Sequence, residues 1–160
     1  AEVKPSEHWN LSAGLNWLQA EYRKFVANGI LVANPAGGFL AANDIDLAGN
    51  DLARSPKLTA NVTVSFDYPV SAGAIFGATN YYHSSRLYFD PANSYSQDAF
   101  GVLNAQLGYR SQAHWWAFAW AKNLTDETYL STVILGQLGG FGFYAEPRTY
   151  GISVGYAFGR

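Results

Sequence analysis

Hydrophobic and polar positions alternate along much of this chain, and the alternation is clearest in two stretches. Between Leu58 and Tyr68 every second residue is apolar, and the residues between them are Thr, Asn, Ser or Asp. Between Tyr150 and Phe158 large residues again occupy every second position, while Gly, Ser and Ala fill the others. A period of two places successive side chains on opposite faces of a β-strand. Both stretches are therefore predicted to be strands that separate two different environments.

The same test along the whole chain predicts six strands. They span residues 9–17, 58–68, 74–88, 103–110, 116–121 and 148–158. In the fifth strand, Trp116, Phe118 and Trp120 are predicted to form the apolar face, whereas the facing of the third strand stays open. Residues 1–7 are predicted to be a polar turn, and residues 26–53 and 125–147 to be long irregular loops rich in turn-forming residues. Long and short connections alternate, which predicts up-and-down hairpins with all short turns at one side.

Aromatic residues collect at the short-turn side of the apolar faces. The predicted membrane-interface girdle consists of Trp9, Tyr68, Tyr109, Trp116, Tyr156 and Phe158. Amphipathic rings are favoured at such an interface, and the same faces carry no charged residue, which would cost about 2–4 kcal/mol at the bilayer midplane. These regularities predict an all-β chain, an antiparallel up-and-down transmembrane β-barrel segment with short periplasmic turns and long extracellular loops.

Composition supports this interpretation and excludes several classes of protein. Charged residues make up only 14% of the chain, although 49% is hydrophobic, and no run approaches the roughly 18 apolar residues of a membrane helix. The chain has no Cys, which excludes disulfides and thiol chemistry. A net charge of -2 gives no reason to expect a nucleic-acid partner.

Candidate chemistry is confined to the predicted loops. Aromatic residues there are candidates for ligand contact, with loop packing as an equal alternative: Phe39, Tyr95, Phe141, Phe143 and Tyr144. Oxygen-bearing residues between Asp44 and Asp51 do not meet the spacing of a calcium loop, so no metal site is predicted. The three His residues lie far apart and no catalytic cluster is evident. We therefore predict that the protein is not an enzyme.

Three ordered segments resemble the C-terminal part of TonB-dependent outer-membrane receptors. Residues 123–129 (NLTDETY) resemble a segment near the end of these receptors, and residues 146–151 (EPRTYG) resemble the opening of their last strand. Residues 46–57, which contain LAGN and SPK, are similar to the approach to an earlier strand. The resemblance implies that residues 1–160 are the C-terminal portion of a 22-stranded barrel in the bacterial outer membrane, without its plug.

The resemblance also implies a function and a set of partners. Such receptors take up a scarce nutrient, for example a ferric siderophore, and the wall contacts outer-membrane lipid, the receptor's own N-terminal strands and the plug domain. The TonB complex and the barrel-assembly machinery are implied as partners through the missing N-terminal region and the last strand, respectively. Asp67 and Arg110 face the predicted lumen, where they either contact the plug or stay solvated, the second being favoured.

Two alternatives stay open at this point. A complete small outer-membrane barrel of eight strands suits the length, but only six strands are found. A soluble β-sheet module that binds carbohydrate is the other alternative, and it requires the large apolar faces to pack against each other.

Overall fold

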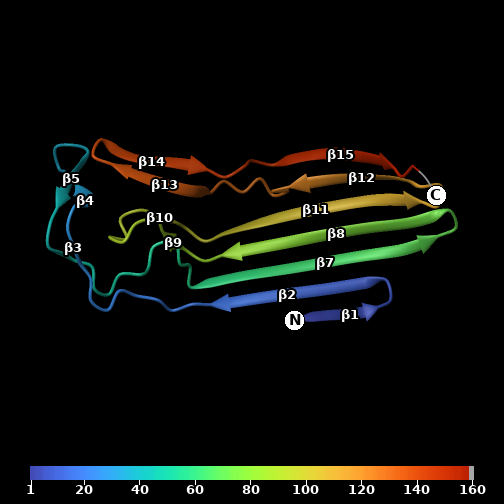
Figure 1. Cartoon of the computed structure of the whole chain (residues 1–160), viewed down its shortest axis with the longest axis horizontal. Helices are drawn as coiled ribbons and strands as arrows, with labels where there is room; N and C mark the ends of the chain where they lie inside the picture. The colour runs from blue at the N-terminus through green and yellow to red at the C-terminus, as the bar shows by residue number, and fades with distance from the viewer. Residues whose placement is uncertain (159–160) are drawn as a thin grey trace.

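The computed structural model describes residues 1–158, and one large sheet dominates it (Figure 1). The sheet has seven strands in the order β1-β2-β7-β8-β11-β12-β15, and each strand is antiparallel to its neighbours. Its members are β1 (Glu2–Ser6), β2 (Trp9–Trp17), β7 (Leu58–Val70), β8 (Gly73–Ser84), β11 (Phe100–Ser111), β12 (Trp115–Lys122) and β15 (Thr149–Tyr156). Sheet order follows chain order, as in the predicted up-and-down arrangement, which is confirmed.

Short turns and long connections lie at opposite ends of the sheet (Figure 1). The short turns cover residues 7–8, 71–72 and 112–114, and the long connections cover residues 18–57, 85–99 and 123–148. No helix that is long and apolar enough to cross a membrane occurs among residues 1–158.

The long connections contain strand pairs of their own, so the prediction of irregular loops at 26–53 and 125–147 is partly wrong. The pairs are β3 (Val26–Ala27) with β6 (Ile45–Asp46), β4 (Ile30–Ala33) with β5 (Phe39–Ala42), β9 (Leu87–Tyr88) with β10 (Ser96–Gln97), and β13 (Leu130–Gly136) with β14 (Gly139–Tyr144). The third predicted strand is also too long, because β8 ends at Ser84 and Leu87 pairs with Gln97 instead. These strands are short, so they show little alternation.

Residues 2–6 form a strand rather than the predicted turn. Val3 pairs with Leu11 of β2, and the N–H of Ala13 donates a hydrogen bond of 2.9 Å to the carbonyl of Ala1. Val3 is the one aliphatic residue in β1, so the sequence shows no alternation there. The pairing depends on the backbone ladder of a hairpin, and Pro5, which cannot donate to that ladder, lies where the register shifts between Val3 and Ser6.

Register divides the sheet into an apolar face and a polar face. One row of paired residues crosses the apolar face: Leu11, Val64, Thr79, Ala105, Ala121 and Tyr150. A parallel row on the polar face contains Thr63, Asn80 and Asn104. The third strand, left open above, places Ile75 and Tyr81 on the apolar face, because they pair with Tyr68 and Val62.

The predicted facing of the fifth strand is wrong. Trp116 pairs with Arg110, and Trp120 pairs with Gln106, so the large side chains predicted to form the apolar face lie on the polar face, and the alanines between them lie on the apolar face. Glycines on the neighbouring strands make room for these rings. A Cβ atom on Gly151 of β15 would lie only 2.6 Å from Cζ2 of Trp120.

The sheet is a single layer without a conventional core. Among residues 1–158 only Leu47 and Val133 are buried apolar side chains, and both lie in the long connections. On the apolar face, Ile152 is 78% exposed and Val154 is 72% exposed. The carbohydrate-binding alternative requires a second apolar face packed against this one, and nothing in the described part of the chain covers it.

Candidate functional site

Aromatic residues gather on the apolar face beside the short turns. The register places Trp9, Tyr68, Tyr109 and Tyr156 there. The Tyr156 ring lies 4.9 Å from that of Phe158, which is 89% exposed. An exposed belt of rings at one level of a sheet is the arrangement that membrane interfaces favour.

Trp116 does not belong to this belt, contrary to the prediction, because it lies on the polar face. Its neighbour Trp115 takes the position instead: it pairs with Tyr156, and its ring centroid lies 5.3 Å from that of Tyr109. Strand register across the short turn between β11 and β12 could have identified Trp115, and not Trp116, as the residue on the apolar face. Counting outward from the turn pairs Arg110 with Trp116 and leaves Trp115 beside Tyr109.

Two of the five loop aromatics predicted as ligand contacts meet each other. The rings of Phe39, on β5, and Tyr95, next to β10, lie 5.9 Å apart. The N–H of Phe39 donates a hydrogen bond of 2.9 Å to the carbonyl of Gln137, at the tip of the β13–β14 hairpin. The ring of Tyr95 also covers Gly140 of this hairpin. Tyr95 therefore connects two loops by packing.

The other three predicted contacts lie on the β13–β14 hairpin, and two of them, Phe141 and Phe143, point away from that cluster. Phe141 and Phe143 alternate with Gly140 and Gly142, whose face is covered by other side chains. Phe141 is 60% exposed, Phe143 is 51% exposed and Tyr144 is 70% exposed. These three side chains are available to a ligand.

Hydrogen bonds tie the first long connection to the second. The side-chain amide of Asn93 donates 2.9 Å to the carbonyl of Asp51, and the N–H of Asp51 donates 2.9 Å to the side-chain oxygen of Asn93. The buried carboxylate of Asp90 accepts from the N–H of Tyr95 at 2.9 Å. Lys57 completes the group with an ion pair of 2.9 Å to Asp51, which raises the pKa of the Lys57 ammonium.

Asn123 organises the third long connection. It is 4% exposed and has a φ of +48°, which its short polar side chain tolerates. Its side-chain oxygen accepts from the N–H of Glu127 at 2.9 Å, and its amide donates to the carbonyls of Glu127 at 2.9 Å and Glu146 at 3.2 Å. Asn104 of β11 accepts the N–H of Asn123 at 3.0 Å. The Asn123 side chain thus joins the two ends of the connection to each other, and its backbone N–H joins them to the sheet.

Tyr129 lies beside this hub and stacks on Phe100, with ring centroids 4.1 Å apart and an interplanar angle of 12°. Burial raises the pKa of the Tyr129 phenol, and the nearby Tyr82 and Glu146 add to the rise. Arg54 joins the first connection to the third, with a hydrogen bond of 2.7 Å to the Thr132 hydroxyl. The three connections therefore form one bonded layer at the loop end.

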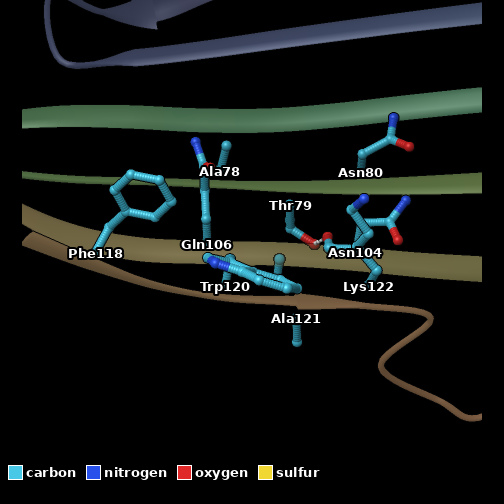
Figure 2. A pocket seen from close by; sticks show the side chains of 10 residues that line it. Ala78, Thr79, Asn80, Asn104, Gln106, Phe118, Trp120, Ala121 and Lys122 are labelled. Atoms are coloured by element: carbon cyan, nitrogen blue, oxygen red, sulfur yellow. Dashed lines mark hydrogen bonds between the residues drawn. The ribbon is translucent and has the colours of Figure 1, made fainter. Parts of the chain in front are cut away.

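The polar face carries charged and polar side chains, which are compatible with contact to water or to other polypeptide. Asp67 and Arg110 pair with each other at 2.6 Å, and Arg110 lies 5.9 Å from the centre of the Phe76 ring. Further along the face is a hollow of about 420 Å³ bordered by Asn104 and Trp120 (Figure 2). Among residues 1–158 no group of three His, Cys, Asp or Glu side chains is arranged to hold a metal ion.

Comparison with known families identifies the architecture. The sequence model of the family described as TonB dependent receptor-like, beta-barrel matches residues 1–124 of the 160. The chain belongs to this family. TonB-dependent receptor barrels are outer-membrane proteins of Gram-negative bacteria, and the family comprises receptors rather than enzymes.

Solved structures of three receptors share the fold. The ferric yersiniabactin uptake receptor FyuA from Yersinia pestis matches with a TM-score of 0.74 and 16% identity, over 96% of this chain and 21% of that chain. The siderophore receptor PiuA from Acinetobacter baumannii gives 0.72 and 18%, over 96% and 20%. BauA, the ferric preacinetobactin receptor from Acinetobacter baumannii, gives 0.68 and 24%, over 97% and 20%. The chain spans about a fifth of the length of each.

Membership of the TonB-dependent receptor barrel family gives the sheet an orientation. In such barrels the apolar face meets lipid, short turns are periplasmic and long loops are extracellular. The bonded layer built on Asn93 and Asn123 then corresponds to the extracellular side. The NLTDETY segment, which carried the resemblance, is the segment that the Asn123 hub holds in place.

Proposed function

We propose that residues 1–160 form the C-terminal part of the barrel wall of an outer-membrane receptor, which takes up a scarce nutrient such as a ferric siderophore with energy from the TonB complex. The observation that carries the proposal is the open antiparallel sheet of seven strands, exposed and apolar on one face, with every long connection at one end. This is the wall of a transmembrane barrel unrolled over part of its circumference.

The edges of the sheet support a larger assembly. Within residues 1–158, strands β1 and β15 are each paired along one side only, which leaves two rows of backbone donors and acceptors without a partner strand there. In a closed barrel these edges pair with further strands, and we propose that the receptor's own N-terminal strands supply them. The plug, the lipid bilayer, the TonB complex and the assembly machinery acting on β15 complete the proposed partners.

The proposed nutrient class rests on the relatives and on the loops. The matched receptors are named for ferric yersiniabactin, for a siderophore and for ferric preacinetobactin. In this chain the exposed Phe141, Phe143 and Tyr144 offer aromatic surface at the extracellular end, while Phe39 and Tyr95 pack beneath. We propose the exposed set as ligand contacts and the packed pair as their support.

The first test is the intact mass of the protein in the outer-membrane fraction of its source cell. A mass several times 17.5 kDa is expected. A mass near 17.5 kDa in that fraction would replace the proposal with a small closed or oligomeric barrel. Recovery from the soluble fraction alone would overturn the membrane assignment itself.

A second test addresses the ligand. Cells carrying Phe141→Ala together with Phe143→Ala are expected to take up radioactive iron from their own iron-limited culture supernatant several-fold more slowly than the parent. Leu40→Ala is the matched control, because Leu40 is an exposed apolar loop residue that is not aromatic. Equal uptake by all three strains at equal receptor abundance would remove these aromatics from the proposed site.

A further inference from the structure

Arg54 lies where the three long connections meet. Its backbone N–H donates a hydrogen bond of 2.7 Å to the carbonyl of Tyr88, in the second connection. Its guanidinium donates a hydrogen bond of 2.7 Å to the hydroxyl of Thr132, in the third connection. One residue of the first connection therefore contacts both of the others, and its side chain makes the contact with the hairpin that carries the proposed ligand contacts.

The backbone of Arg54 adopts a conformation that favours glycine. Its φ is +58°, in the left-handed region, where a residue with a Cβ atom is strained. Strained residues of this kind persist where the surrounding structure fixes them, and they cluster at functional sites. The backbone on either side of Arg54 is fixed, because Asp51 exchanges two hydrogen bonds with Asn93, and Lys57 pairs with Asp51 at 2.9 Å. The guanidinium therefore extends from an anchored point of the chain.

Thr132 occupies the position of the β13–β14 hairpin from which Phe143 is directed. The two residues are paired directly, so their side chains lie on the same face of the hairpin. The register shifts between Leu130 and Thr132, and the extra residue, Ser131, donates from its hydroxyl to the carbonyl of Phe143 at 2.9 Å. A β-bulge bends its strand and redirects the side chains beside it. Arg54 therefore binds the hairpin at the bend from which Phe143 projects.

We propose that Arg54 is a positioning residue for ligand binding, because its guanidinium holds Thr132 and thereby fixes the direction in which Phe143 is presented. The inference rests on the proposed function, since it takes Phe143 as a ligand contact. It deepens that function by giving a role to a residue of another connection. Arg54 acts through Thr132 and needs no contact with the ligand itself.

The rest of the hairpin is held independently of this hydrogen bond. At its base the N–H of Leu130 donates to the side-chain oxygen of Gln97 at 2.7 Å, and at its tip the carbonyl of Gln137 accepts the N–H of Phe39. Loss of the guanidinium should therefore leave the hairpin folded and attached at both ends, while the bulge between them gains freedom. A ligand then has to order Phe143 as it binds, which lowers affinity without removing the binding surface.

Arg54→Gly is the sharpest test, because it removes the guanidinium and also relieves the strained backbone. Cells that carry the full-length receptor receive radioactive iron in a dilution series of their own iron-limited culture supernatant. We expect Arg54→Gly to raise the half-saturating supernatant concentration several-fold, with little change in the maximal rate, in receptor abundance or in the thermal midpoint. A merely structural role would instead lower the abundance and the midpoint and leave the half-saturating concentration unchanged.

Three further variants define the contact. Thr132→Val removes the acceptor hydroxyl at nearly constant shape, and it should raise the half-saturating concentration as much as Arg54→Gly does. Combining the two changes should add nothing, because both remove the same hydrogen bond. Arg23→Gly is the matched control and should behave as the parent, since Arg23 is another exposed arginine of the first connection.

Hydrogen exchange of residues 130–136 gives a readout that needs no ligand, and it should be several-fold faster in Arg54→Gly than in Arg23→Gly. The inference is overturned if Arg54→Gly matches the parent in exchange and in half-saturation. It is also overturned if only the exchange of Arg54→Gly changes while Phe141→Ala with Phe143→Ala slows uptake. If that aromatic double variant leaves uptake unchanged too, the proposed ligand contacts fail as well, so the two failures are distinguishable.

Discussion

Replacing Gly151 by Ala tests whether aromatic side chains on the polar face lie over glycines of the last strand. The new Cβ atom would lie 2.6 Å from Cζ2, 2.9 Å from Cε2 and 3.2 Å from Nε1 of Trp120. Comfortable carbon contacts begin at about 3.5 Å, so the indole has to move by about 1 Å. Overpacking of this kind costs about 1–3 kcal/mol, and the free side of the indole places the expected cost in the lower half of that range.

A matched control is available on the same face of the sheet. A Cβ atom on Gly14 of β2 would meet nothing within 4 Å, and the backbone there does not require glycine. Gly14→Ala is therefore expected to be neutral or to stabilise the protein by about 0.4–1 kcal/mol through the unfolded state. Urea unfolding of the receptor in lipid vesicles, followed by the gel mobility of unheated samples, gives the unfolding free energies.

A double mutant isolates the contact. In a Trp120→Ala background the Gly151→Ala change should cost nothing, which corresponds to a coupling energy of about 1–2 kcal/mol. The reasoning fails if Gly151→Ala costs the same with and without the indole. It also fails if Gly14→Ala destabilises the receptor as much as Gly151→Ala does.

Three further changes test the hub, the faces and the pH response of the loops. Asn123→Gly keeps the positive φ but removes three side-chain hydrogen bonds, so it should lower the unfolding free energy by about 2–4 kcal/mol in the same assay. Asn123→Ala should lower it by about 1 kcal/mol more, because alanine is strained at a positive φ. Equal costs for the two variants would contradict a role for the positive φ. Ile152→Arg on the apolar face should cost about 2–4 kcal/mol, and Ser153→Arg on the polar face clearly less; equal folding yields in vesicles would contradict the assigned faces. The pKa values of Lys57 and Tyr129 are raised in the folded protein. Their contribution to the stability of the long connections is therefore fully present below about pH 10 and is lost as the pH rises through these raised pKa values. Hydrogen exchange of the connections should become faster over that pH range.

The clearest strands of the large sheet, such as β7 and β15, were predictable because each has two chemically different faces. From Leu58 to Tyr68 the alternation has no exception, and the structure pairs this stretch on both sides. In β12, large aromatic residues alternate with alanine, and neither set is polar. The predicted apolar face of this strand was therefore chosen by side-chain size alone. Alanine suits a lipid face as well as tryptophan does, and the deciding fact lies on other strands, where Gly108 and Gly151 leave space for rings.

The candidate site was less predictable because long-range contacts build it. The hydrogen bond between Arg54 and Thr132 joins residues 78 positions apart, and the bonds between Asp51 and Asn93 join residues 42 apart. Neither pairing has a local pattern in the sequence. Phe39, Tyr95 and Phe141 were found as loop aromatics, but the division into a packed pair and an exposed set depends on which side of the β13–β14 hairpin each occupies.

The absence of a core among residues 1–158 supports the proposal that this wall is part of a longer receptor. Both faces of a single sheet are open, and the described part buries only Leu47 and Val133 as apolar side chains. Backbone pairing alone contributes little net free energy in water, because the unfolded chain bonds to water instead. In the proposed receptor, lipid against Ile152 and its neighbours supplies the apolar contact that a core would otherwise provide.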